Sequence, residues 1–213
     1  HEQCFNDRGL CTQLTSKAWS EADGRFTNII DVAGNTGMWT EFLSNDMVAV
    51  SHSYGLEGEP HPTARGVLIH LQTYDRLNRI VRQQLLGTNG VECAYDESGW
   101  SRIENRYYEN GVTKRTDIYA PPGCGGIWGA TNVHHVVTTF DMQGNVLSQS
   151  YLGTNGLAVA DNVNVHCVRF QYGMIAGKRC QTSEWYLNER DLEVANANGV
   201  ARLDNTYDSN GVL

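Results

Sequence analysis

The sequence predicts an all-β fold made of tandem antiparallel β-hairpins. Short runs rich in Val, Ile, Tyr, Phe and Thr are each bounded by Gly, Asn or Asp, which is typical of strands and tight turns. A long segment also occurs twice. Residues 73–90 read TYDRLNRIVRQQLLGTNG and residues 139–156, which lie 66 positions later, read TFDMQGNVLSQSYLGTNG. A fixed spacing indicates stacked units, here a super-repeat of about 66 residues in an extended or curled sheet.

Five runs are expected to form strands because their β-branched and aromatic residues alternate with polar ones. They are VLIHLQTYD (67–75), NRIVRQQLL (78–86), VHHVVTTFD (133–141), NVLSQSYLG (145–153) and NVHCVRFQYG (164–173). Asn-Gly pairs favour tight hairpin turns because glycine accepts a positive φ angle at little cost. These pairs are Asn89-Gly90, Asn110-Gly111, Asn155-Gly156, Asn198-Gly199 and Asn210-Gly211.

The repeat suggests a division of the chain into four parts. They are an N-terminal cap or degenerate repeat (1–65), two repeat units (66–132 and 133–198) and the start of a further unit (199–213). A chain that stops as a unit begins is expected to be a piece of a longer protein, or to leave an open sheet edge that pairs with another molecule.

Two segments depart from the strand pattern. LTSKAWSEADGRF (14–26) is the one short helix candidate, with Thr15 or Ser16 as its cap. APPGCGGIWGA (120–130) holds two Pro and four Gly, so it cannot be a strand and is expected to be an ordered loop.

Charge and hydropathy exclude two classes of partner. The net charge is −8, whereas a nucleic-acid partner requires a basic surface that neutralises phosphates. No apolar stretch approaches the roughly 18 residues of a spanning helix, so no transmembrane segment is expected. Six cysteines favour an oxidising compartment, and we therefore expect a secreted or cell-envelope protein.

The cysteines suggest three pairings and one alternative. Cys167 and Cys180 would face each other if residues 165–182 form a hairpin. Cys4 and Cys11 could close a small loop, which leaves Cys93 with Cys124 by elimination. The alternative is six reduced, buried thiols.

Four Tyr-Asp or Phe-Asp starts carry a family resemblance: YDRLNRIV (74–81), YDESG (95–99), FDMQGNVL (140–147) and YDSNGVL (207–213). They resemble the YD repeats of RHS and teneurin-like proteins and of related bacterial extracellular tandem β-hairpin proteins. The resemblance covers residues 66–213 and implies envelope or extracellular hairpin repeats that serve as shells, adhesins or spacers. It supplies no catalytic residue, and the LGTNG segments and the doubled period depart from that family.

These observations predict a structural or adhesive repeat protein that self-assembles through open sheet edges. The expected partner is a further copy of the chain, another cell-surface protein or a glycan. We expect no cofactor. The motifs GxSxG, HExxH, the P-loop and GxGxxG are all absent from the sequence, so an enzyme is not the expectation.

A carbohydrate-binding module is the first alternative, because Trp side chains in polar loops can stack on sugars. Trp128 in the Gly-rich loop and Trp100 are the candidates. His134 and His135 are further binding candidates. As neighbours in a strand they should point to opposite faces, so they cannot hold one ion together.

A metal-dependent extracellular enzyme is the second alternative. The amine and ring of His1 could bind copper with one further histidine, which tetragonal Cu(II) favours. The available histidines are His61, His70, His134, His135 and His166. His52 and His61 could also meet a metal together with Glu57 or Glu59.

Overall fold

The computed structural model describes residues 2–5, 11–15, 17–20, 25–28, 37–43, 47–55, 57–63, 66–93, 98–208, 210 and 212. All regular structure in these residues is antiparallel β, which confirms the predicted all-β class. None of them forms a helix of the length and hydropathy that crossing a membrane requires. His1 and Gly211 lie outside the described residues.

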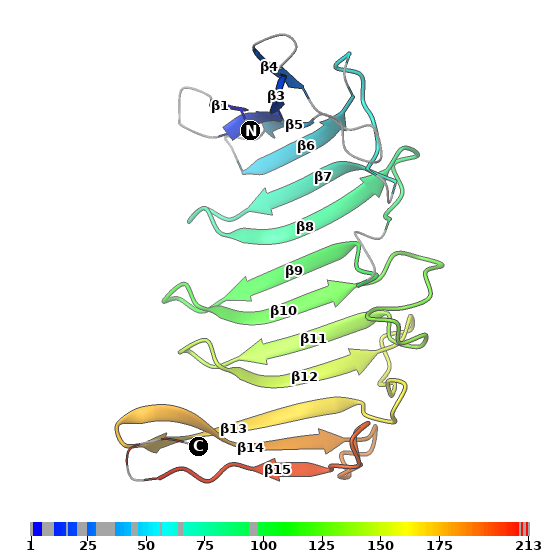
Figure 1. Ribbon diagram of the computed structural model, residues 1–213. Helices are drawn as coiled ribbons and strands as arrows, with labels where there is room; N and C mark the ends of the chain where they lie inside the picture. The colour runs from blue at the N-terminus through cyan, green and yellow to red at the C-terminus, as the bar shows by residue number, and fades with distance from the viewer. Residues whose placement is uncertain are drawn as a thin grey trace. The chain divides into compact units, whose positions relative to one another are not determined.

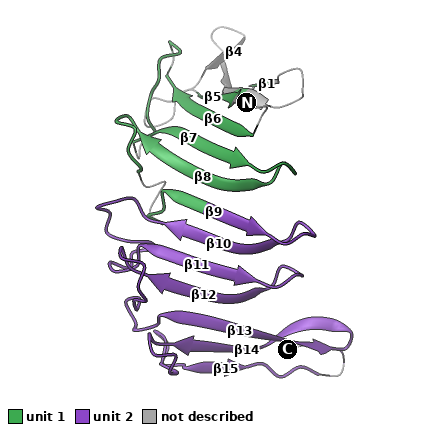
Figure 2. Cartoon of the chain, turned by 180° about the vertical axis from the view of Figure 1, so that it is seen from behind, with its two compact units in different colours: residues 1–103 green, residues 104–213 purple. Residues whose placement is uncertain are grey.

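The chain divides into two compact units, residues 1–103 and 104–213 (Figure 2). The first contains β1 (Glu2–Phe5), β2 (Cys11–Thr15), β3 (Lys17–Ser20), β4 (Arg25–Asn28), β5 (Gly37–Leu43), β6 (Val48–Tyr54), β7 (Val67–Tyr74) and β8 (Ile80–Gly87). Hydrogen-bonded neighbours follow the order β1-β2-β5-β6-β7-β8, and β3 pairs with β4 in a separate ribbon (Figure 1).

The second unit is an open antiparallel sheet whose strands pair in chain order. Its strands are β9 (Arg102–Tyr107, which straddles the division), β10 (Thr113–Tyr119), β11 (His135–Phe140), β12 (Val146–Leu152), β13 (Cys167–Ile175), β14 (Lys178–Leu187) and β15 (Arg202–Asp204). The expected strands at 67–75, 78–86, 133–141, 145–153 and 164–173 are thereby confirmed as β7, β8, β11, β12 and β13.

Hairpins recur at a nearly constant interval along the sequence. The second strands of successive hairpins end at residues 54, 87, 119, 152 and 187, which are 32 to 35 residues apart. After four of these strands the chain folds back and forms an isolated antiparallel bridge between two residues that are six positions apart. The bridged pairs are Tyr54–Pro60, Leu86–Glu92, Leu152–Ala158 and Leu187–Glu193. The exception is β10, after which residues 120–134 replace this short return.

One five-residue turn connects many of these segments. In residues 141–145 the Asp141 N–H donates to the Asn145 carbonyl (2.9 Å) and the Gly144 N–H donates to the Asp141 carbonyl (3.1 Å). The fourth residue has a positive φ, 88° at Gly144, and is always Gly, Asn or Asp. The same turn occurs at 75–79, 87–91, 108–112, 153–157, 161–165, 188–192 and 196–200.

Acid and amide side chains cap these turns, which gives the Asp of the YD starts a structural role. Asp141 Oδ1 accepts the N–H groups of Gln143 and Asn145, both at 2.9 Å. Asp75 and Asp208 accept the equivalent pairs of N–H groups. Because each of these three carboxylates satisfies two turn donors, folding accounts for the Asp at these three starts; Asp96 of the fourth start lies outside the described residues.

The predicted helix at 14–26 is wrong, because this segment forms parts of β2, β3 and β4. Lys17 pairs with Asn28 and Ser20 with Arg25 in an antiparallel ribbon. This strand pairing outweighs the helical composition of the segment, of which residues 16 and 21–24 lie outside the described ranges.

The Cys167–Cys180 pairing is also wrong. Both belong to the β13–β14 hairpin, but Cys167 lies opposite Leu187 and Cys180 lies opposite Gly173. The two cysteines therefore sit at different ends of a long ribbon. Cys93, Cys124, Cys167 and Cys180 are free thiols, which also removes the Cys93–Cys124 pairing. The Cys4–Cys11 pairing stays a prediction, because the side chain of Cys11 is not among those that the structure describes.

Candidate functional site

The loop at residues 120–134 builds a small hydrophobic core against β10, β11 and β12. Its ends are joined by a hydrogen bond from the Ala120 N–H to the His134 carbonyl (2.9 Å). Ile127 and Val133 are buried, at 0% and 2% exposure, and pack with Val136 of β11. As predicted, the segment 120–130 forms an ordered loop and no strand.

Backbone constraints fix the position of Trp128 within this loop. The Ile127 N–H donates to the Val133 carbonyl (2.7 Å), and the Ala130 N–H donates to the Ile127 carbonyl (3.0 Å). A Cβ on Gly126, whose φ is 107°, would lie 2.0 Å from the Ala130 carbonyl oxygen. Trp128 itself has a φ of 52°, which is strained for a bulky residue. Such strain persists where the surroundings impose it, and it is a frequent property of binding sites.

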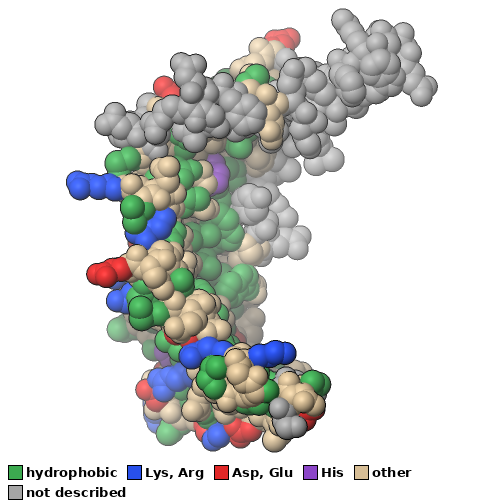
Figure 3. All heavy atoms as spheres, turned by 90° about the vertical axis from the view of Figure 1, so that its left-hand side faces the viewer, with side chains coloured by type: hydrophobic (Ala, Val, Ile, Leu, Met, Phe, Trp, Pro, Cys, Tyr) green, Lys and Arg blue, Asp and Glu red, His purple; other side chains and the backbone are tan. Residues whose placement is uncertain are grey.

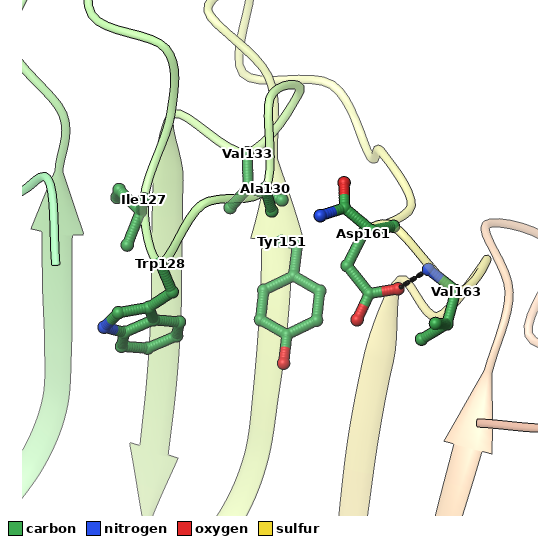
Figure 4. A pocket seen from close by; sticks show the side chains of 8 residues that line it. Ile127, Trp128, Ala130, Val133, Tyr151, Asp161 and Val163 are labelled. Atoms are coloured by element: carbon green, nitrogen blue, oxygen red, sulfur yellow. Dashed lines mark hydrogen bonds between the residues drawn. The ribbon is translucent and has the colours of Figure 1, made fainter. Parts of the chain in front are cut away.

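A cavity of about 200 Å³ opens between this loop, β12 and the 161–165 turn. It is lined by Ile127, Trp128, Ala130, Val133, Tyr151, Asp161, Asn162 and Val163. We call it the Trp128 pocket. In Figure 4 the Trp128 indole and the Tyr151 ring point the same way, and the Asp161 carboxylate lies beyond Tyr151. Trp128 is 49% exposed, so its ring is accessible from solvent.

Asp161 gives the pocket a carboxylate with one oxygen already engaged. Its Oδ1 accepts the N–H groups of Val163 (2.9 Å) and Val165 (3.0 Å), which closes the 161–165 turn (Figure 4). Oδ2 has no hydrogen bond from the part of the chain that the structure describes. The turn therefore orients Asp161 and leaves one oxygen for a ligand.

Tyr151 contributes a neutral hydroxyl. Burial of the ring, followed by the negative charge of Asp161, raises the pKa of Tyr151 to about 12. The hydroxyl donates to Gln149 Oε1 (3.3 Å) and therefore remains protonated at physiological pH. Asn162 ties the two loops of the pocket together, since its Nδ2 donates to the Gly129 carbonyl (3.2 Å). The pocket combines an exposed indole, a phenol, an amide and a carboxylate.

Of the residues predicted for binding, Trp128 alone lines this pocket. Trp100 belongs to the other compact unit. His135 is engaged elsewhere, because its Nε2 lies 2.8 Å from Asp117 Oδ1 and its ring stacks on Tyr119 at 4.2 Å. The backbone of His134 pairs with Ala120 and Leu152.

Asp117 forms a buried ion-pair cluster on β10. Its side chain is 3% exposed, and Arg115 donates to it through Nε and Nη2, both at 2.6 Å. Burial alone would raise the pKa of Asp117, but the hydrogen bonds and charges of Arg115 and His135 outweigh it and hold the pKa below its ordinary value. The cluster holds β10 in register against β11, and the Asp117 carboxylate within it is closed to solvent.

No group of three or more His, Cys, Asp or Glu side chains suited to a metal gathers within the described ranges. The hypothesis that His1 binds copper lies outside those residues. His52 stacks on Trp39, with ring centroids 4.4 Å apart.

Sequence reasoning missed Tyr151, Asp161 and Asn162. One signal was present: Tyr151 stands where the earlier copy of the repeat has Leu85, within segments that otherwise agree closely. Asp161 resembled any turn residue, because its pocket role depends on the loop 33 positions earlier in the chain.

Comparison with known protein families finds no family model that matches the chain, and comparison with curated proteins finds no matching protein.

Proposed function

We propose that the chain is a structural and adhesive repeat module of a secreted or cell-envelope protein, and that its adhesive contact is a glycan held in the Trp128 pocket. The observation that carries the proposal is an exposed, strained Trp on a packed loop beside a carboxylate with a free oxygen. Secretion rests on the resemblance of the Tyr-Asp starts.

The scaffold part of the proposal rests on the hairpin interval. Two successive hairpins of about 33 residues would together make up the predicted 66-residue super-repeat, and Asp or Asn side chains cap many of the turns. Such locally satisfied hairpins suit stacking in an extended sheet, because each unit contacts its neighbours and needs no distant partner. Self-association through sheet edges stays a prediction, and light scattering of the purified chain over a range of concentrations would test it.

The adhesive part rests on the chemistry of the pocket. Sugar rings present C–H faces that pack on an indole and hydroxyls that bond to carboxylate and amide groups. A cavity of about 200 Å³ is smaller than the roughly 300–1,000 Å³ of enclosed drug-sized sites. It therefore suits one residue of a longer glycan whose remainder lies in solvent.

Titration with neutral oligosaccharides of glucose, mannose and N-acetylglucosamine tests this function, with Trp fluorescence and calorimetry as readouts. At least one series should bind, and Trp128→Ala should remove binding. Asp161→Asn is the sharper variant. The turn should persist, since Asn196 caps the equivalent turn with the same two bonds, while the carboxylate is lost.

Asp208→Asn is the matched control, because Asp208 makes the same turn bonds and does not line the pocket. We expect Asp161→Asn to weaken binding at least tenfold and Asp208→Asn to leave it unchanged. Binding that survives Trp128→Ala intact would remove the pocket from the proposal.

A further inference from the structure

A second hollow lies at the hairpin-turn ends of β9 to β12, on a different part of the same unit. Its volume is about 530 Å³, and it is lined by Arg106, Tyr107, Tyr108, Lys114, Arg115, Thr139, Phe140 and Leu147. None of these residues lines the Trp128 pocket. Figure 3 shows the hairpin-turn side of the chain, where Lys and Arg side chains (blue) reach the surface beside hydrophobic ones (green).

Three cations line this hollow in a chain whose net charge is −8. Among the described residues, neither Arg106 nor Lys114 has an acidic partner. Lys114 Nζ lies 5.6 Å from the centre of the Tyr108 ring, and the Tyr108 hydroxyl donates to the Phe140 carbonyl (2.8 Å), which fixes that ring. The ammonium group is therefore positioned over an aromatic face and remains open to an anion.

Arg115 contributes donors more than charge. The Nε and Nη2 groups of Arg115 donate to the Asp117 carboxylate, which neutralises the charge of the guanidinium. Those hydrogen bonds raise the pKa of Arg115. Its Nη1 is not used by Asp117, and the side chain is 36% exposed. The hollow thus offers two uncompensated positive charges and one oriented guanidinium edge, a geometry that matches sulfate or carboxylate oxygens.

The fold does not require these charges. One hairpin later, 33 positions along the chain, Arg106, Lys114 and Arg115 correspond to Thr139, Leu147 and Ser148. There an uncharged hydrogen bond joins β11 and β12, since Thr139 Oγ1 and Ser148 Oγ lie 2.7 Å apart. The sheet forms with uncharged residues at these positions, so stability alone does not account for the cluster.

We propose that this hollow binds an anionic group, a sulfate ester or a carboxylate, of an acidic polysaccharide. The cations bind the anion, and the rings of Tyr107 and Tyr108 supply apolar surface for the adjoining sugar. One sulfate or carboxylate needs only this local cluster of cations. A nucleic acid binds along a continuous basic surface, which a chain of net charge −8 does not favour. The inference goes beyond the proposed function, because it does not depend on the Trp128 pocket.

Binding of dextran sulfate, polygalacturonate and uncharged dextran to the intact chain tests the proposal at a fixed, moderate salt concentration. At least one anionic polymer should bind and dextran should not. Binding of dextran sulfate alone would assign a sulfate ester, and binding of polygalacturonate alone would assign a carboxylate. The double variant Arg106→Gln/Lys114→Gln should weaken binding at least tenfold. Both side chains are exposed, so the variant should fold, which circular dichroism checks.

Lys178→Gln/Arg190→Gln is the matched control, because it removes the same charge from two exposed residues outside the hollow, one at the start of β14 and one in the turn after it. It should change affinity less than twofold. Trp128→Ala should retain anionic binding, which separates this site from the adhesive pocket. Equal losses in both double variants, no binding of either anionic polymer, or tighter binding of single-stranded DNA would each overturn the proposal.

Discussion

The buried carboxylate of Asp117 provides a quantitative test of what stabilises the second unit. Its side chain is 3% exposed and has three hydrogen bonds, two from Arg115 and one shared with His135. Removing one partner of a buried ion pair costs about 3–5 kcal/mol, because the remaining charge is left without compensation. Since Arg115 is 36% exposed and can turn toward water, we expect Asp117→Asn to cost about 3 kcal/mol.

Asp191→Asn is the control, because it removes the same charge from an ion pair of similar length in solvent. Arg169 Nη2 lies 2.7 Å from Asp191 Oδ1, and the two side chains are 50% and 64% exposed. Such pairs contribute about 0–1 kcal/mol. Urea unfolding followed by circular dichroism gives both free energies, provided that the m-values agree. Equal losses in the two variants would refute the assignment of Asp117 as a buried stabilising charge.

Three further predictions concern pH and the turns. The pKa of Asp117 is lower in the folded than in the unfolded chain, so its contribution to the free energy of unfolding is complete above the unfolded pKa and is lost as the pH falls through the folded pKa. The free energy of unfolding, measured from pH 6 downward, should therefore decline less steeply in Asp117→Asn than in the wild-type chain. Gly156→Val should cost about 1–3 kcal/mol in thermal unfolding, because its φ of 74° strains a β-branched residue, whereas Gly125→Ala, at an open position without a positive φ, should change little. Asp161→Ala should lose about 1–2 kcal/mol by leaving two turn donors unsatisfied, and Asp161→Asn should lose almost none; identical melting of the two would contradict the turn-capping role.

The parts of the fold that were predictable depend on local signals. Strands β7, β8, β11, β12 and β13 follow from short apolar runs between turn residues. Gly90 and Gly156 have the positive φ angles that their Asn-Gly pairs predict. The preceding Asn caps the turn instead of adopting a positive φ itself, because the connection is a five-residue turn and not a two-residue one.

The failures come from register and from long-range packing. Cys167 and Cys180 bracket a hairpin, but their alignment depends on the lengths of β13 and β14, which the composition does not define. Trp128 was found because its loop breaks the repeat. Tyr151 and Asp161 were not, because the pocket forms only when that loop folds over β12.

Calorimetric titration of neutral oligosaccharides against the wild-type chain, Trp128→Ala and Asp161→Asn tests the central claim, a glycan site in the Trp128 pocket, most directly. We expect at least one oligosaccharide to bind the wild-type chain and both variants to weaken that binding at least tenfold. Binding that both variants leave unchanged would contradict the claim.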